Sequence, residues 1–235
     1  MTVLALIQSF CRRTALPVPS TIEGGEDPQV VQIVELLNQG LEELCRKWSW
    51  QSLTREAHFT TVASESQGLL EDIAPDGFVS IFQSTIYNRT LRLPVYGPVQ
   101  GATWQGLKAL PTTGPLYKYR IVRGEILFNP VPIAGHQCYF EYKSRNAVIA
   151  GDTSVKAAFT EDSDTCVFPD DILMAYLRFA FKQEKGFEYA EDEARYEEAV
   201  RSASGIDATK PAIRMDSLSS DWKPGIFVPF GNWRV

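Results

Sequence analysis

"CVFPDDILMAYLRFAFKQEKGFEY", residues 166–189, is the stretch that decides the fold of this 235-residue chain. Residues 172–181 hold one charged side chain, Arg178, and are far fewer than the roughly 18 apolar residues that cross a bilayer. At helical spacing they form two adjacent apolar stripes, one of Ile172, Tyr176 and Phe179 and one of Leu173, Leu177 and Phe181. An ordinary surface helix has a single stripe, so we expect two different neighbours to cover this helix: the N-terminal helices on one face, and the inserted β domain or a neighbouring subunit on the other.

Two further helices are predicted near the N-terminus. Residues 2–13 form the first, with apolar side chains on one side. Asp27 followed by Pro28 marks a strong helix start, and apolar residues then recur at helical spacing over residues 28–48. Gly40 weakens that helix by up to about 1 kcal/mol relative to alanine, so we expect a packing reason for it.

The middle of the chain has the texture of short β-strands. Between residues 51 and 150, runs rich in aromatic and β-branched residues are separated by proline and glycine, which predicts an antiparallel β-sandwich or barrel. The pair Arg123 and Gly124 lies between two such runs and indicates a hairpin. A short helical turn is expected to begin at Pro75.

A helical pattern of residues begins again at residue 169, is interrupted at Gly186 and then continues. Two helices joined by a short loop with a glycine predict an antiparallel helix hairpin. The predicted fold is therefore α+β, with a discontinuous helical bundle, an inserted antiparallel β domain and an extended C-terminal arm. The expected limits are 1–50 and 166–204 for the bundle, 51–165 for the β domain and 205–235 for the arm.

The charge disfavours a protein that grips nucleic acid or a membrane. The net charge is −6, and residues 151–198 hold 13 acidic against 5 basic side chains, which makes one acidic face. The first residues lack the features of an export signal and suit an amphipathic helix better. The four cysteines are widely spaced, so we expect reduced, buried thiols.

Catalytic machinery is not indicated. Nucleotide-binding, zinc-protease and serine-hydrolase motifs are absent. His136 and Cys138 could share a strand face and begin a zinc site, but no second pair of ligands accompanies them. Asp170 and Asp171 suit a helix N-terminus better than a hydrolytic pair, and Trp104 suits a core better than a sugar platform. We therefore predict no catalytic residue, no metal and no cofactor; the rival is a carbohydrate-binding or hydrolytic β-domain protein.

The last residues carry large aromatic side chains without any helical or strand period. The members are Trp222, Phe227, Phe230 and Trp233. A segment of this kind cannot build a core of its own, so it either folds back on its own chain or docks on a partner as an extended arm.

Four passages of the chain resemble the head-to-tail adaptor (connector) proteins of tailed bacteriophages, especially the tail tubular protein A-like adaptors of short-tailed phages. Their order and spacing carry the resemblance. They are "LLNQGLEELCRKWSWQSLTREAHFTT" (36–61), "LLEDIAPDGFVSIF" (69–82), "YKYRIVRGEILFNPVP" with "CYFEYKS" (117–144) and "FPDDILMAYLRFAFKQEKGFEYAEDEARYEEAV" (168–200). The second departs from the usual L-P-x-D form, reading Ala74, Pro75, Asp76.

The resemblance implies a structural protein of the virion, made in the host bacterial cytoplasm and placed at the head–tail junction. Such adaptors form a closed ring of typically about twelve copies below the portal protein. The ring extends the DNA channel, serves DNA ejection and presents a surface to the tail nozzle or hub. Double-stranded DNA would pass through without specific binding, which suits an acidic wall. In related adaptors a C-terminal arm grips the portal, which assigns that role to the four aromatic residues of the tail.

A ring would also cover the second stripe of the doubly apolar helix, because each copy in a ring contacts two neighbours through different surfaces. Tyr176, Leu177 and Phe181 are therefore the candidate subunit-interface residues. Another phage tail component, such as a nozzle or completion protein, remains the alternative within the same setting.

Overall fold

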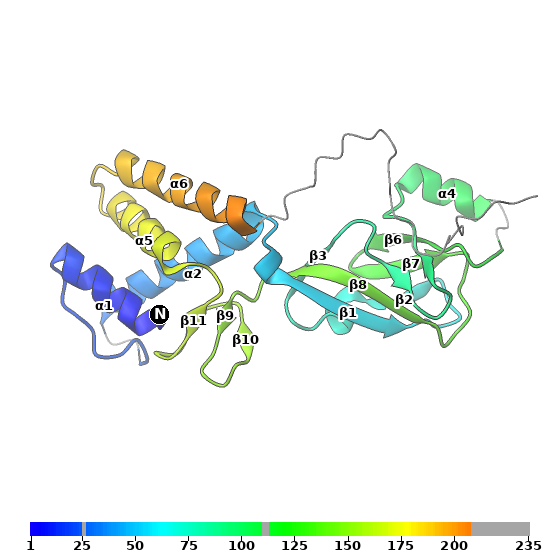
Figure 1. Cartoon of the computed structure of the whole chain (residues 1–235), viewed down its shortest axis with the longest axis horizontal. Coiled ribbons are helices and arrows are strands. Elements are labelled where there is room, and N and C mark those ends of the chain that lie inside the picture. The colour runs from blue at the N-terminus through cyan, green and yellow to red at the C-terminus, as the bar shows by residue number, and fades with distance from the viewer. Residues whose placement is uncertain (25–26, 110–112, 208–235) are drawn as a thin grey trace, which may run out of the picture. The chain divides into compact units, whose positions relative to one another are not determined.

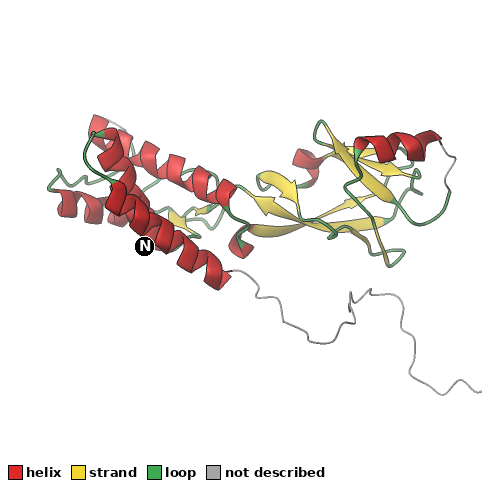
Figure 2. Ribbon diagram, turned by 90° about the horizontal axis from the view of Figure 1, so that it is seen from above, coloured by secondary structure: helices red, strands yellow, loops and turns green. Residues whose placement is uncertain are grey.

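The chain has a mixed α+β fold in a computed structural model that describes residues 1–24, 27–109 and 113–207 (Figures 1 and 2). The α-helices of the described residues are α1 (Val3–Thr14), α2 (Pro28–Lys47), α3 (Leu70–Ile73), α4 (Gly101–Ala109), α5 (Asp170–Glu184) and α6 (Ala190–Asp207). The strands are β1 (Thr54–Thr60), β2 (Ser66–Leu69), β3 (Phe78–Ile81), β4 (Tyr87–Asn88), β5 (Leu93–Pro94), β6 (Lys118–Val122), β7 (Glu125–Asn129), β8 (Gln137–Ser144), β9 (Val148–Ile149), β10 (Val155–Lys156) and β11 (Thr165–Cys166). A 3₁₀ turn spans Gln51–Leu53.

The chain divides into two compact units. The helical unit consists of Met1–Arg55, Pro75–Ser80 and the described residues of Tyr142–Thr209. The β unit consists, within the described residues, of Glu56–Ala74 and Ile81–Glu141. Residues 142–165, which the sequence analysis places in the inserted β domain, thus group with the helices, and the limits 51–165 stay a prediction. The predicted arm, apart from its first three residues in α6, lies outside the described residues.

The N-terminal helices begin where the sequence predicts. α2 starts at Asp27, whose carboxylate accepts a hydrogen bond from the backbone N–H of Gln29 at 2.9 Å, with Pro28 in the first turn. α1 starts one residue later than expected, because the side chain of Thr2 caps it. Both helices have basic residues in the last turn, where the helix dipole favours them.

The predicted helix hairpin is confirmed as α5 and α6. Gly186 lies between them with φ of 71°, a left-handed conformation that glycine adopts without steric penalty. The backbone N–H of Phe187 returns to the carbonyl of Lys182 at 2.9 Å, which closes the end of α5.

Gly40 has the packing reason that its position in α2 demands. A Cβ atom at this position would lie 2.3 Å from two ring carbons of Tyr176, far inside van der Waals contact. The missing side chain therefore lets the Tyr176 ring of α5 lie directly on the backbone of α2.

We expected a neighbouring subunit to cover the second apolar stripe of α5, because the chain alone would leave it exposed. That expectation is wrong. Tyr176, Leu177 and Phe181 are all buried within the single chain. The Phe181 ring meets Phe10 of α1 edge to face at 5.3 Å, and Tyr176 meets Tyr196 of α6 at 5.3 Å. Because α1, α2 and α6 surround α5, both of its stripes belong to one continuous core.

A small three-stranded sheet of order β10-β9-β11 completes the helical unit. The loop before β11 is fixed by Asp164, whose buried carboxylate lies 2.8 Å from the ammonium of Lys156. The other carboxylate oxygen accepts the backbone N–H groups of Thr160 and Glu161. The carbonyl of Asp164 accepts the N–H of Val3 at 2.7 Å, so this loop also holds the start of α1.

The β unit contains strands of two sheets. One has the order β1-β8-β4-β5, with β3, most of which belongs to the helical unit, also paired to β8, and the other is antiparallel with the order β2-β7-β6. The Phe59 ring of β1 lies 6.2 Å from Phe140 of β8 in its own sheet and 5.8 Å from Phe128 of β7 in the other sheet, so it joins the two. Trp104, on α4, is 2% exposed, so its interpretation as a core residue is confirmed.

Local predictions in the β region succeed and fail for identifiable reasons. The hairpin is confirmed, since Arg123 and Gly124 both have positive φ between β6 and β7. The helical turn expected from Pro75 is wrong: residues 75–77 make a tight turn and β3 follows. Gly77 there has φ of 74°, and its carbonyl accepts the N–H of Arg145, a long-range contact that local spacing does not reveal.

Candidate functional site: the assembly surfaces

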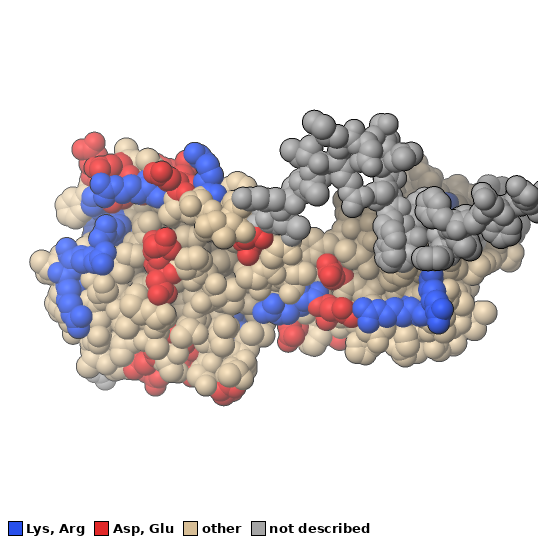
Figure 3. All heavy atoms as spheres, viewed as in Figure 1, with Lys and Arg blue, Asp and Glu red and all other residues tan. Residues whose placement is uncertain are grey.

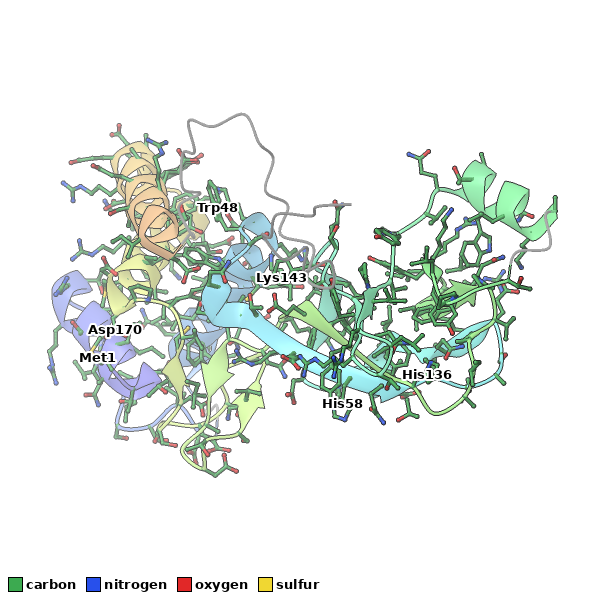
Figure 4. All side chains as sticks on the ribbon, turned by 45° about the vertical axis from the view of Figure 1, so that its right-hand side comes forward. Met1, Trp48, His58, His136, Lys143 and Asp170 are labelled. Atoms are coloured by element: carbon green, nitrogen blue, oxygen red, sulfur yellow. The ribbon has the colours of Figure 1, made fainter. Side chains whose placement is uncertain are left out.

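The two carboxylates at the start of α5, Asp170 and Asp171, stabilise the helix, and one of them forms an ion pair. The N-terminal ammonium of Met1 lies 3.2 Å from a carboxylate oxygen of Asp170 (Figure 4). Asp170 and Asp171 both lie in the first turn of α5, where carboxylates stabilise the helix dipole. This pair therefore has the structural role that the sequence favours.

A buried lysine ties the end of α2 to β8. Lys143 is 6% exposed, and its ammonium donates to the carbonyl of Trp48 (Figure 4). Burial lowers the pKa of Lys143 from its usual value. The nearby Cys45 thiol, also desolvated, has its pKa raised to about 11 and donates weakly to the Arg145 carbonyl at 3.8 Å.

All four cysteines are free thiols; Cys11, Cys45 and Cys138 are buried, as the sequence predicts, and Cys166 is half-buried. Burial raises the pKa of each: to about 12 for Cys138 and Cys166, to about 11 for Cys45, and upward for Cys11. Because the thiolate is the reactive form, these raised pKa values do not suit a nucleophile at neutral pH.

The two histidines have separate surroundings (Figure 4). His58 stacks on the ring of Tyr139 at 5.2 Å, and the guanidinium of Arg89 lies 3.5 Å from that ring's centroid. His136 lies within 3.5 Å of the Asn88 amide. Within the described residues, no three His, Cys, Asp or Glu side chains come together as a metal site would need.

A groove of about 600 Å³ runs along the C-terminal half of α6, and we name it the α6 groove. Its lining comprises Trp50, Ser52, Val167, Phe168, Pro169, Asp171, Arg195, Glu198, Ala199, Ser202, Ala203, Ile206 and Asp207. Three α6 side chains in it are small, Ala199, Ser202 and Ala203, and Ile206 near the end of α6 is 83% exposed. Figure 3 shows acidic and basic side chains interleaved over the edge of the helical unit that carries α6.

The outer face of α2 has two further hollows, of about 750 and 520 Å³. Glu35 and Gln39 line both, so the hollows adjoin along the helix. This face is mainly polar: Glu42 pairs with Arg46 one turn on, and Val31 is its large exposed apolar side chain.

An exposed apolar tip marks the β unit. Its members, Val62, Val131 and Ile133, lie on two loops that Thr61 holds together. The Thr61 hydroxyl donates to the carbonyl of Ile133 at 2.6 Å, and the Thr61 carbonyl accepts the N–H of Gly135 at 2.9 Å. Three aliphatic side chains on loops are thus fixed in position and left in solvent.

A family model described as SU10 adaptor protein matches residues 1–220. The chain belongs to the SU10 adaptor protein family. The predicted resemblance to bacteriophage head-to-tail adaptors is thereby confirmed. The search of curated proteins finds no match for this adaptor.

The family match covers both the helical unit and the β unit of the adaptor. It ends at residue 220, before Trp222, Phe227, Phe230 and Trp233. These four predicted arm residues also lie outside the described residues. Within the described residues, no helix of the adaptor is long and apolar enough to cross a bilayer.

The predicted interface residues of the adaptor are the three buried side chains of α5 described above. A neighbouring subunit would reach Tyr176, Leu177 or Phe181 only if α1 or α6 moved. Their assignment to a subunit interface therefore stays a prediction, but the uncovered apolar stripe on which it was based does not exist. Sequence reasoning missed the α6 groove and the apolar tip. Aliphatic residues in the loop "NPVPIAG", residues 129–135, were the available signal for the tip, since loops are usually polar there.

Proposed function

We propose that this adaptor is a structural, non-enzymatic subunit of the head–tail junction of a bacteriophage. It assembles as a closed ring of about twelve copies below the portal protein, extends the DNA channel and joins the portal to the tail nozzle or hub. The observation that carries the proposal is the family match over residues 1–220, which spans both compact units rather than one domain.

The charge of the chain supports a passive DNA channel. The chain has 29 acidic against 23 basic side chains, and the first turn of α6 carries Glu191, Asp192 and Glu193, so acidic groups outnumber the basic ones that would bind phosphates. A channel wall of this sign repels the DNA backbone, so DNA slides past it during ejection rather than binding.

We assign the portal contact to the C-terminal arm and its aromatic residues Trp222, Phe227, Phe230 and Trp233. Several arms from one ring would act together through effective concentration, so each contact can be weak alone. A chain that ends at Asp207 is expected to keep the helical circular-dichroism signal and lose portal binding. Undiminished docking by the shortened chain would reject the assignment.

Electron microscopy of the adaptor mixed with the purified portal protein tests the function. We expect a second ring stacked on the portal ring, while the adaptor alone need not assemble, since the portal can act as a template. Finding the protein on tails but never at the portal would instead favour a nozzle or completion protein. Binding of a glycan array would favour the carbohydrate-binding reading.

A further inference from the structure

The α6 groove is a partly apolar surface of the described chain. The apolar lining residues that stay at least partly exposed are Val167, Pro169, Ala199, Ala203 and Ile206, whereas Trp50 and Phe168 beneath them are buried. At about 600 Å³ it lies within the range of sites that hold aromatic and aliphatic groups. The neighbouring stripe of α6, with Tyr196 and Val200, is buried in the core, and Ala199 and Ala203 at the edge of the groove are partly buried against it.

The rim of the α6 groove is acidic. Asp171, Glu198 and Asp207 line it together with one basic residue, Arg195. Arg195 is already paired with Glu191 at 2.6 Å. The rim therefore favours an occupant that combines apolar side chains with positive charge.

The last described residues of the chain line the α6 groove. Ile206 and Asp207 are the last described residues and part of the groove lining. The carboxylate of Asp207 accepts the backbone N–H of Gln51 at 2.5 Å, which fixes the end of α6 beside Trp50. Residues 208–235 therefore start at the groove.

The composition of residues 208–235 matches the groove. This segment contains the four large aromatic residues of the tail together with Ile213, Ile226 and Val228. It has four basic side chains, Lys210, Arg214, Lys223 and Arg234, and two acidic ones, Asp216 and Asp221. Its side-chain charge is thus positive, opposite to that of the rim, and within 222–233 it comes from Lys223 alone.

The length of the segment also fits. The 15 residues from Asp207 to Trp222 have a typical end-to-end distance of about 20 Å as a flexible chain. The groove wall from Arg195 to Asp207 is about 18 Å long at the rise of an α-helix. A tether of this length gives an effective concentration in the millimolar range, well above that of a second copy at micromolar protein.

We propose that the α6 groove binds the aromatic segment 222–233 of the same chain. The occupant is the chain's own segment, because tether length and the point where the described chain ends favour it over the same segment of a second copy. This inference does not need the ring or the portal. If the arm also grips the portal, the groove and the portal compete for it.

Photo-crosslinking in the full-length chain tests the inference. p-Benzoylphenylalanine replaces Phe227, and after irradiation the cross-linked peptides are identified by mass spectrometry. We expect species of monomer size in which Phe227 is joined to residues 167–171 or 199–206. The same crosslinker at Phe187, which is 61% exposed between α5 and α6, should not reach these peptides.

A pair of neighbouring substitutions controls for the fold. Ser202→Trp places an indole in the α6 groove and should lower the Phe227 cross-link to it about tenfold, as loss of about 1.4 kcal/mol predicts. Arg201→Trp lies on exposed α6 surface outside the lining and should leave the yield unchanged.

Three outcomes would overturn the inference. Dimer-sized products joining Phe227 to groove peptides would show that a second copy is the occupant. Products that avoid residues 167–171 and 199–206 would show that the segment binds elsewhere. Equal loss of the cross-link in both tryptophan variants would show that the groove does not select it. None of these results bears on stacking with the portal, so the proposed function would fail or stand separately.

Discussion

α5 and α6 form one helix hairpin, yet they bury their side chains in opposite ways. The sequence of α5 suggests a helix that needs a partner subunit, but the chain itself buries both of its apolar stripes except for the half-buried Phe179. α6 looks like a solvated acidic helix, and it forms the wall of an open groove. The difference teaches two things. A helix with apolar residues on two sides can simply be the central helix of its own bundle, whereas a groove can form on a helix whose sequence shows only small and charged side chains.

The largest expected effect tests the buried side of this comparison. Phe181→Ala removes a ring that packs on Phe10 and should lower the free energy of unfolding by about 3–5 kcal/mol. Phe187→Ala, on an exposed phenylalanine, should change it by less than about 0.5 kcal/mol. Urea denaturation measures both. If Phe181→Ala kept full stability and only weakened assembly, Phe181 would be an interface residue after all.

The second prediction concerns Asp164 in the loop that leads to α5. Burial alone would raise the pKa of its carboxyl, but hydrogen bonds from Lys156 and from the N–H groups of Thr160 and Glu161 outweigh it, so the pKa lies below its usual value. A lowered folded pKa stabilises the protein above about pH 4, and that stability is lost as pH falls through the folded pKa.

Asp164→Asn should therefore lower the free energy of unfolding at pH 7 by about 1–3 kcal/mol and flatten the loss of stability below about pH 4. Glu161→Gln is the control, because Glu161 lies 3.6 Å from the same lysine but is exposed. Thermal melts between pH 3 and 7 measure the difference. Parallel pH profiles for wild type and Asp164→Asn would contradict the assigned ion pair.

The third prediction tests the contact between α2 and α5. Gly40→Ala should lower the free energy of unfolding by about 1–3 kcal/mol through overpacking against Tyr176, despite the better helix propensity of alanine. Gly106→Ala in α4 has open space around its Cβ and should raise it by about 0.5–1 kcal/mol. Chemical denaturation separates the two, and two changes of the same sign would show that the Tyr176 ring yields.

The smallest expected effect concerns the acidic rim of the α6 groove. Glu198→Lys reverses one charge on the α6 groove and should lower the Phe227 cross-link about two- to threefold at low salt. Glu197→Lys changes the adjacent exposed residue outside the groove and should have little effect. The difference should vanish in high salt; a difference that persisted would point to altered packing instead of charge.

Elements with strong local signals could be predicted from the sequence. The cap at Asp27, the break at Gly186 and the turn at Arg123 and Gly124 each fix a boundary through backbone chemistry. No comparable local signal marks α4, because its two glycines and its single buried side chain, Trp104, leave no clear helical period. β3 was missed because its pairing with β8 is made by residues about 60 positions away.

The candidate surfaces were harder to predict than the fold. The family resemblance was found from the order of elements, but a groove needs residues from three places in the chain. Trp50, Phe168 and Ala203 are brought together only by the packing of α6 beside the loop that precedes α5. The stripe on α5 misled for the same reason, since the sequence does not say how many helices surround it.

The four protonated thiols make this chain a convenient host for spectroscopic labels. Each native cysteine is deprotonated only well above neutral pH, so maleimide dyes and nitroxide radicals should leave them largely untouched in the folded protein. One cysteine introduced on the surface would then carry the label nearly alone. Distances within the free adaptor and within the assembled virion could be followed without first removing any native sulfur.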